Sequence, residues 1–374
     1  MSAASPLRVT PLNSIHRAAG AKMVDFGGWD MPVQYSGIVD EHHAVRTAVG
    51  IFDVSHMGDI LLSGPQALAA VQHISMNDVS RLSLGQAQYS ALLYPQGTFV
   101  DDVIVHRLGD DEYLLVINAG TREKDFKWVR DNTRQFDCRV ENLSDDFTQI
   151  AIQGPKGIDL LQKVSDADLS TVKFYWVTRG AVCGLKNILI ARTGYTGEDG
   201  FEIYIPSDEP TSARVWNEVL EAGKEFGAIP CGLGARNTLR LESKLPLYGH
   251  EISDTINVWE AGLDRFCKME KLEFIGRETL EKAREHGLSR TLIGLEVTAR
   301  GIARDGYKVL DSAGKEIGYV TSGSYAPFLK KNIALAYVPP ESSAVGSELQ
   351  VEIRGAGVKS KVVLTPFYKK PKRS

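Results

Sequence analysis

A single carboxylate stands in an apolar, strand-forming segment just past the middle of the chain. The segment from Ala191 to Pro206 reads ARTGYTGEDGFEIYIP. It predicts two short strands joined by a turn, which Gly194, Gly197 and Gly200 permit because they lack a Cβ atom. Glu202 would place a hydrogen-bond acceptor where a folded protein usually packs apolar atoms. Alternatively, it is the solvated glutamate of an exposed hairpin, since charged side chains mostly lie in water.

Two adjacent aspartates interrupt a second apolar segment, GTFVDDVIVHRL, from Gly97 to Leu108. Because side chains alternate along a strand, Asp101 and Asp102 point to opposite faces, and at most one of them can enter a given pocket. Burying an ionised carboxylate is costly unless it is paired or hydrogen-bonded. These acids therefore lie either at a strand end in water or in a site that requires one of them. Periodicity alone does not choose between the two.

A pair of arginines follows two glycines in GLGARNTLRLESKLPLYG, from Gly232 to Gly249. The segment predicts a helix on which Arg236 and Arg240 lie one turn apart. They are either surface arginines of an amphipathic helix or guanidinium groups that bind a planar acceptor such as a carboxylate or a ring carbonyl.

Two aromatic segments, FGGWDMPVQY and IFDVSHMGDI, are ambiguous by composition. We expect Phe26, Trp29 and Phe52 to belong to the core, and His56 to be a core or rim histidine with satisfied hydrogen bonds. The glycine spacing at Gly194 differs from GxGxxG and precedes a strand, which disfavours a dinucleotide site. The sequence also contains neither a Walker A motif nor a GxSxG elbow.

The elements that must position these residues alternate irregularly between strand and helix up to about residue 280. This order is neither a regular βαβ repeat nor all-β, and it favours an α+β fold with antiparallel sheets. The predicted strands are Ile51–Leu62, Ala87–Leu93, Thr98–Arg107, Glu112–Asn118, Phe147–Gln153, Asn187–Thr193 and Phe201–Ile205. The predicted helices are Gly64–His73, Thr121–Asn132, Pro155–Val164, Thr211–Phe226 and Gly232–Glu242.

The pattern changes after a polar, helix-like connector from Gly276 to Gly287. Short strand-like runs separated by Gly, Asp and Pro follow, which is typical of a small closed barrel or a sandwich. They are Thr291–Val297, Tyr307–Leu310, Glu316–Thr321, Ile333–Val338 and Glu348–Ile353. We therefore place a domain boundary near residue 285, with one region at 1–285 and a second at 286–374.

Composition, charge and cysteine content indicate which broad class of protein the chain belongs to. The chain has 374 residues, of which 43% are hydrophobic and 24% charged, and a net charge of −4. This is typical of a globular protein with two or three domains, and it disfavours nucleic acid as a partner. Four scattered cysteines predict neither disulfides nor a zinc site. We see no secretory signal and no apolar run that could span a membrane, and we expect a cytoplasmic protein without membrane contact.

Eight segments, in order along nearly the whole chain, carry a family resemblance. They are Lys22–Tyr35, Phe52–Gly58, Gly97–Val105, Asn118–Gly120, Gln153–Pro155, Gly194–Ile203, Leu233–Glu242 and Thr321–Val338. In this order they resemble the glycine cleavage T-protein family of tetrahydrofolate-dependent aminomethyltransferases. The resemblance implies a folate-binding region of two subdomains with antiparallel sheets, followed by a C-terminal β-barrel, around a central channel.

The resemblance also implies roles for individual residues. The family's essential acid falls on Asp102, its pterin-contacting acid on Glu202 and its pterin-contacting arginine on Arg236. Positions that line the family's folate pocket are Met57, Tyr89, Val116 and Tyr195. Arg265 stands where some relatives carry a tryptophan, with Trp259 nearby in the sequence.

The implied reaction moves the methylene of an aminomethyl group from a lipoyl sulfur to tetrahydrofolate, with release of ammonia. Its carrier is the lipoylated H-protein, which works with the P- and L-proteins in glycine catabolism, and the step needs neither a metal nor pyridoxal phosphate. The basic tail from Lys369 to Arg373 is expected to attract an acidic carrier or the glutamate tail of folate.

Two other functions remain open at this point. A sister folate-dependent demethylase, acting on a small donor without a lipoyl carrier, would share the fold and pocket. A non-catalytic folate-binding assembly factor for iron–sulfur proteins would carry a cysteine in a KGCYxGQE-type segment, where this chain has GYTGEDGFE.

Overall fold

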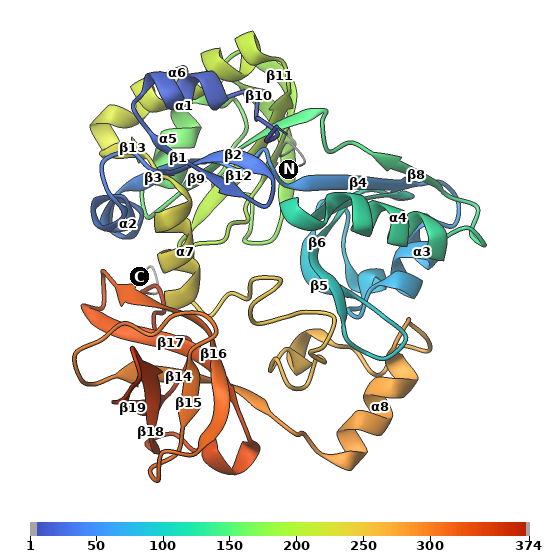
Figure 1. Ribbon diagram of the computed structural model, residues 1–374. Helices are drawn as coiled ribbons and strands as arrows, with labels where there is room; N and C mark the ends of the chain where they lie inside the picture. Colours follow the sequence, from blue (N-terminus) through green and yellow to red (C-terminus); the bar gives the residue numbers. More distant parts are fainter. Residues whose placement is uncertain (1–5, 372–374) are drawn as a thin grey trace. The chain divides into compact units, whose positions relative to one another are not determined.

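A computed structural model describes residues 6–371 of the chain (Figure 1). The chain divides into two compact units. The first runs up to Ala67 and includes Leu82–Gln88 and Ile104–Asn237; the second includes Leu68–Arg81, Tyr89–Val103 and the residues from Thr238 on. The predicted boundary near residue 285 stays a prediction. Of the predicted basic tail, Lys372 and Arg373 lie outside the described residues.

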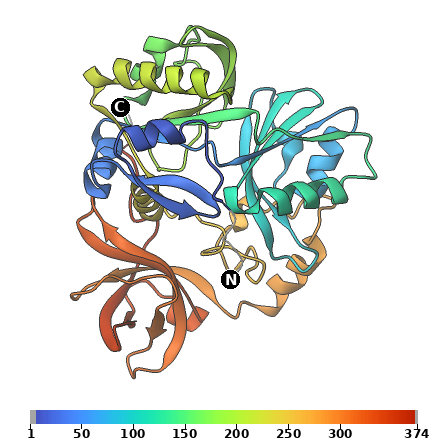
Figure 2. The same ribbon diagram turned by 45° about the horizontal axis from the view of Figure 1, so that its top comes forward.

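The first unit is built on a mixed sheet of the order β10-β11-β12-β9-β3-β13. All its neighbours are antiparallel except β13, which runs parallel to β3. The strands are β10 (Val177–Val182), β11 (Leu185–Ala191), β12 (Gly200–Pro206), β9 (Phe147–Gln153), β3 (Val49–Asp53) and β13 (Ala228–Pro230). Helices α1 (Asn13–Ala18), α5 (Gly157–Val164) and α6 (Glu209–Gly223) contribute to the same unit. Figures 1 and 2 both show α1 and α6 side by side, where His16 meets Trp216 edge to face with ring centroids 5.3 Å apart.

The alternation in β12 gives the two faces of the strand different surroundings. Phe201, Ile203 and Ile205 are fully buried in one hydrophobic cluster with Trp216. Glu202 and Tyr204 point to the other side of the strand because side chains alternate. The predicted hairpin is confirmed, since β11 pairs with β12 and sets Ala191 opposite Glu202.

A second sheet has the order β5-β6-β7-β4-β8, and the division between units falls within β5 and β6. Its strands are β5 (Ala87–Leu93), β6 (Phe99–Gly109), β7 (Glu112–Ile117), β4 (Gly58–Ser63) and β8 (Arg139–Asn142). The remaining elements of the first unit are the hairpin β1 (Lys22–Phe26) and β2 (Trp29–Gln34), with α2 (Ile38–Thr47) and α4 (Arg122–Asn132). Seven elements have no counterpart among the predicted helices and strands: α1, α2, β1, β2, β8, β10 and β13.

The prediction of one continuous strand from Ile51 to Leu62 is wrong. The chain forms β3 and β4 in two different sheets. Asp53 causes the break, because its carboxylate accepts hydrogen bonds from the backbone N–H of Ser55 at 2.9 Å and from the Ser55 hydroxyl at 2.5 Å. The N–H of Met57 then bonds to the Val54 carbonyl at 3.0 Å, and this turn redirects the chain.

The second unit ends in a closed barrel of the order β14-β17-β16-β15-β18-β19. This confirms the predicted barrel and excludes the sandwich. Its strands are β14 (Thr291–Val297), β15 (Lys308–Leu310), β16 (Glu316–Ala326), β17 (Lys331–Val338), β18 (Glu348–Ile353) and β19 (Ala356–Val363), the last of which was not predicted. The unit also contains α3 (Ala67–Ile74) except its first residue, the end of α7 (Leu233–Glu242), and α8 (Arg277–His286).

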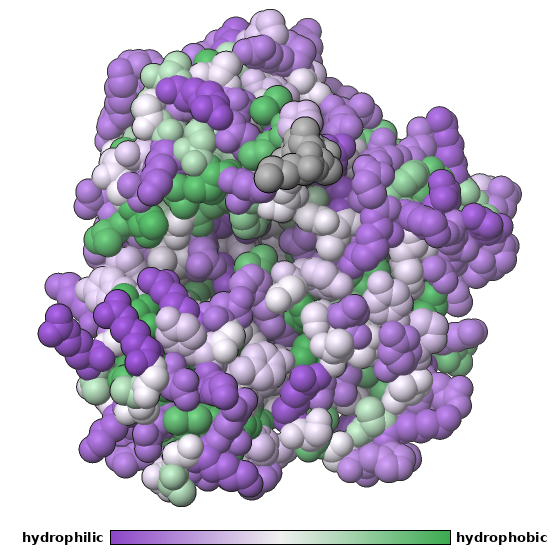
Figure 3. Space-filling view, in the orientation of Figure 1, coloured by the Kyte–Doolittle hydropathy of each residue, from purple (hydrophilic) through white to green (hydrophobic). Residues whose placement is uncertain are grey.

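On the face drawn in Figure 3, hydrophilic residues predominate and hydrophobic residues occur in small groups. None of the helices within residues 6–371 is both long and apolar enough to cross a bilayer. All four cysteines are free thiols.

Candidate active site

Glu202 is half-buried on the face of β12 opposite to Phe201 and Ile203, flanked by Ala191 of β11 and Ala151 of β9. Burial raises its pKa, and two partners oppose that rise: a hydrogen bond from the Thr193 hydroxyl and the positive charge of Arg236. Glu202 is therefore not the solvated glutamate of an exposed hairpin. It is a carboxylate held in the protein near a guanidinium group.

The loop before Glu202 is fixed by Gln153, at the end of β9. The Gln153 amide donates to the Thr193 carbonyl at 3.0 Å and accepts from the Thr196 hydroxyl at 2.8 Å. A Cβ atom on Gly194 would lie 2.0 Å from the Gln153 side-chain oxygen, and one on Gly200 would lie 2.5 Å from the Ile152 carbonyl. These glycines are needed because another chain segment approaches them closely.

Two ion pairs hold the same loop. Arg46 of α2 donates to the Thr196 carbonyl at 2.8 Å and to the carboxylate of Glu198 at 2.9 Å, and both side chains of this pair are buried. Arg192 binds both carboxylate oxygens of Asp199, at 3.0 and 2.6 Å. The loop that carries Tyr195 is thus fixed at both of its ends.

Arg236 is positioned by the start of α7, which packs tightly against β2. A Cβ atom on Gly232 would lie 2.4 Å from the carbonyl carbon of Val33, so the backbones touch. The buried carboxylate of Glu41 accepts from the Gly232 N–H at 2.8 Å and from the Tyr35 N–H at 2.5 Å. This acid ties the loop after β2 to the beginning of the arginine-bearing helix.

The guanidinium of Arg236 contacts two residues that were predicted to line the pocket. Its central carbon lies 4.3 Å from the ring centroid of Tyr195, and one of its nitrogens lies 4.0 Å from the sulfur of Met57. Burial raises the pKa of Glu202 and the charge of Arg236 opposes that rise, whereas burial lowers the pKa of His56 and the charge of Arg236 adds to that shift. The structure therefore brings Glu202, Arg236, Tyr195 and Met57 together within the first unit.

A buried acid that was not among the predicted site residues lies near Glu202. Asp59 of β4 pairs across the sheet with Val116 of β7, the position predicted to line the pocket. Asp59 is fully buried, and the Gln149 amide donates to it. Burial raises its pKa well above the usual range, and the charge of Glu202 adds to the rise. The signal in the sequence was an acid directly after Gly58 in an otherwise apolar strand.

Asp102 and Tyr89 belong to the second unit, and their convergence with Glu202 stays a prediction. Asp101 is fully buried, whereas Asp102 is half-buried and donates its backbone N–H to the Asp101 carboxylate at 3.0 Å. Neither aspartate therefore lies at a strand end in water. The ring of Tyr89 packs on Phe266 at 4.7 Å, and the guanidinium of Arg265 covers that phenylalanine at 4.4 Å.

Arg240 has a structural role. It is 1% exposed and binds the buried carboxylate of Glu251 at 2.7 Å and the Ser322 hydroxyl at 2.7 Å. The interpretation of Arg240 as a surface arginine is wrong, because the face of α7 that carries Arg240 is buried.

Trp29 and Phe52 are buried as predicted, but Phe26 is only partly buried. His56 is fully buried, and within residues 6–371 neither of its ring nitrogens has a hydrogen-bond partner, so the expectation of satisfied hydrogen bonds is wrong.

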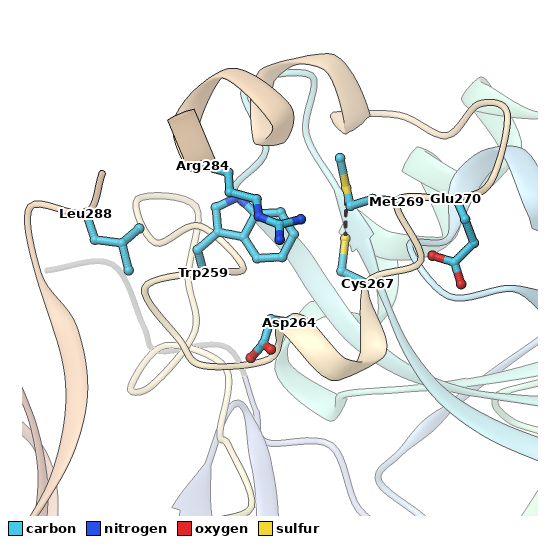
Figure 4. Close-up of a pocket in the computed structure, with 7 residues that line it drawn as sticks. All are labelled: Trp259, Asp264, Cys267, Met269, Glu270, Arg284 and Leu288. Atoms are coloured by element: carbon cyan, nitrogen blue, oxygen red, sulfur yellow. Dashed lines mark hydrogen bonds between the residues drawn. The ribbon is translucent and has the colours of Figure 1, made fainter. Parts of the chain in front are cut away.

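Two cavities have linings made of other residues. One of about 550 Å³ in the second unit is lined by Trp259, Cys267, Met269 and Arg284, among others. Figure 4 shows Arg284 crossing Trp259, and the Cys267 and Met269 sulfurs facing each other at 3.7 Å. The other, of about 270 Å³ in the first unit, has a largely apolar lining that includes Tyr204. Neither lining contains a predicted site residue. Within the described part of the chain, no cluster of three or more His, Cys, Asp or Glu side chains could share a metal ion.

Comparison with known proteins identifies the family. Residues 12–271 match the model of the GCVT N-terminal domain, and residues 290–369 match that of the glycine cleavage T-protein C-terminal barrel domain. The aminomethyltransferase of Koribacter versatilis is 71% identical over 371 residues, 98% of each chain. That of Acidobacterium capsulatum is 65% identical over 373 residues, 100% of this chain and 99% of the relative. The crystal structure of the glycine cleavage system aminomethyltransferase T from Bartonella henselae superimposes with a TM-score of 0.90 at 33% identity, over 97% of this chain and 98% of that one. The chain belongs to the glycine cleavage T-protein family of aminomethyltransferases.

Proposed function

We propose that the protein transfers the methylene of an S-aminomethyl-dihydrolipoyl carrier to tetrahydrofolate and releases ammonia. In this reaction the carbon–sulfur bond and the carbon–nitrogen bond of the aminomethyl group break, and the carbon forms bonds to two folate nitrogens. The two protons lost by those nitrogens are taken up by the departing sulfur and the departing ammonia. The balance needs no oxidant, metal or pyridoxal phosphate.

The observation that carries the proposal is the grouping of Glu202 with Arg236. A pterin ring has an edge that carries both N–H donors and a carbonyl acceptor. A carboxylate can accept from the N–H groups, and a guanidinium can donate to the carbonyl. Tyr195 and Met57, which contact Arg236, would cover the ring and exclude water. Val116, opposite Asp59, completes this side of the proposed pocket.

Asp102 is the proposed catalytic acid, and Tyr89 the proposed pocket residue beside it. A carboxylate near the folate nitrogens orients them and stabilises the positive charge that develops on the methylene carbon. The partial burial of Asp102 is compatible with this role because the electrostatic effect of a charge is larger away from bulk water.

The physiological partner we propose is the lipoylated H-protein of a glycine cleavage complex that also contains P- and L-proteins. Glycine catabolism in the cytoplasm is the corresponding setting. The division into a folate-binding region at 1–285 and a barrel at 286–374 is part of the same proposal.

Ammonia release tests the proposal directly. The full chain is mixed with tetrahydrofolate and a carrier loaded with the aminomethyl group, and ammonia and methylenetetrahydrofolate are measured together. Equimolar formation of both products is expected. Turnover with small methylated donors but not with the carrier would instead identify a demethylase.

A further inference from the structure

The cavity of about 270 Å³ lies inside the first unit, between strands of its two sheets. Leu61 of β4 and Leu114 of β7 line it from one sheet, and Leu189 of β11 and Tyr204 of β12 line it from the other. The same four side chains belong to one hydrophobic cluster, in which all but Leu61 are buried. The cavity is therefore an unfilled part of the apolar interface between the two sheets.

The strand register places this cavity next to the candidate active site. Leu189 pairs with Tyr204 across β11 and β12, and one step along the same strands Ala191 pairs with Glu202. Residues two apart share a face of a strand and lie about 7 Å from each other. Tyr204 lines the cavity and Glu202 does not, so the cavity begins one layer of side chains beyond Glu202.

The mouth of the cavity carries charges of both signs. Glu112 precedes Leu114 by two residues and shares its face of β7, and Arg179 of β10 pairs with Leu189 and shares its face. Asp146, which is exposed, adds a second carboxylate. Within residues 6–371, none of these three charged groups forms an ion pair. The acid of one sheet and the base of the other are thus both available to a ligand.

An apolar cavity with both charges at its mouth is complementary to a small zwitterion with an apolar side chain. An apolar cavity of about 150 Å³ in another protein admits benzene, so this one can hold a branched or aromatic side chain. A guanidinium donates two parallel hydrogen bonds to a carboxylate, and a carboxylate accepts from an ammonium group. Arg179 also donates to the Asn187 carbonyl at 3.1 Å, which holds its guanidinium at the mouth.

We propose that this cavity is a binding site for a free α-amino acid with an apolar side chain, whose carboxylate binds Arg179 and whose ammonium group binds Glu112. The side chain of the ligand would lie between Leu114 and Tyr204, where its apolar surface is removed from water. A fatty acid or an apolar amine would leave one sign of charge at the mouth without a partner, and it therefore fits the site less well. The inference is independent of the proposed function, because it uses no residue of the proposed folate site.

Calorimetric titration of the full chain tests the proposal, with leucine as the probe. 4-Methylpentanoate and 3-methylbutylamine keep the leucine side chain but lack the ammonium group or the carboxylate, and glycine lacks the side chain. Arg179→Gln and Glu112→Gln each remove one charge from the mouth. Lys156→Gln is the matched control, since it removes an exposed charge of the first unit that does not line the cavity. Thermal unfolding of every variant is followed in parallel.

The expected results depend on both charges and on the side chain. Leucine should bind, and glycine, 4-methylpentanoate and 3-methylbutylamine should each bind at least about tenfold more weakly. Arg179→Gln and Glu112→Gln should each weaken leucine binding about tenfold to a hundredfold at an unchanged unfolding temperature, whereas Lys156→Gln should bind as the parent protein does.

Three results would overturn the inference. The first is the absence of any heat of binding with leucine at millimolar concentration. The second is leucine binding that both mouth variants leave unchanged, because the ligand would then lie elsewhere. The third is equal affinity for leucine and 4-methylpentanoate, because the site would then recognise a carboxylic acid and not an amino acid.

Discussion

Mild acid should destabilise the first unit through its two neutral, buried histidines. The pKa of His56 is lowered from 6.5 to about 3 and that of His106 to about 4, in both cases mainly because burial disfavours the charged ring. Below pH 6.5 the unfolded chain binds a proton at each site and the folded chain does not. Stability is therefore present above the unfolded pKa and falls as the pH drops toward the folded values.

The magnitude follows from proton linkage. Between pH 7.5 and 5.5, each histidine that protonates only on unfolding lowers the free energy of unfolding by about 1.4 kcal/mol, and the pair by about 2.7 kcal/mol. Carboxylates also contribute to the pH dependence of the free energy of unfolding. Glu202 and Asp59 have raised pKa values and act in the opposite direction, because they bind a proton more tightly when folded. Asp53, with a pKa of about 2, contributes only at lower pH.

Variants isolate the histidine contribution. Urea unfolding is measured at pH 7.5, 6.5 and 5.5 for the parent chain, for His56→Phe, for His106→Phe and for the double variant. The carboxylates are common to all four proteins and cancel in the differences. Each substitution should reduce the acid-induced loss by about 1.4 kcal/mol, and the two reductions should add. Parallel curves for all four proteins would refute the reasoning, since they would mean that neither ring is kept neutral by the fold.

Three further predictions concern the proposed site and its support. Asp102→Asn should leave the unfolding temperature unchanged and slow ammonia release at least about a hundredfold; near-normal turnover would remove Asp102 from the mechanism. Glu202→Ala and Arg236→Ala should each weaken tetrahydrofolate binding by about 1–3 kcal/mol in calorimetry, because each leaves a buried partner unpaired, whereas unchanged affinity would place the pterin elsewhere. Gly194→Ala should lower the free energy of unfolding by about 1–3 kcal/mol, because the new Cβ atom meets Gln153; a fully stable variant would show that Gln153 can move aside.

The elements predicted best are those whose apolar pattern has a single period. Strands β5, β9, β14 and β18 have the predicted bounds, and α4 and α7 differ from prediction by one residue. The barrel was predicted only as a barrel or a sandwich, because closure depends on pairing between β14 and β19, and β19 was not recognised. Its sequence, AGVKSKVV, alternates weakly and reads as a polar loop.

The candidate site was only partly accessible from sequence. Glu202 and Arg236 were candidates from the residue pattern alone, whereas their pterin roles and the choice of Tyr195 and Met57 came from the family resemblance. The structure brings these four residues together within one unit. The partners that position them could not be read from the chain. Glu41, for example, lies 191 positions before the Gly232 N–H that it binds, and no local pattern encodes so distant a contact.

The fold tolerates a carboxylate on one face of β12 because the opposite face of the same strand is fully apolar and buried. Burying Phe201, Ile203 and Ile205 contributes about 1.5–3 kcal/mol each. That gain offsets the destabilisation from a partly desolvated Glu202 and from the unpartnered atoms of nearby Asp59 and His56. A two-residue period makes the arrangement possible, since one strand can supply the core with one face and the site with the other. It also implies that core substitutions on β12 should impair the site by shifting Glu202, even though they touch no residue of it.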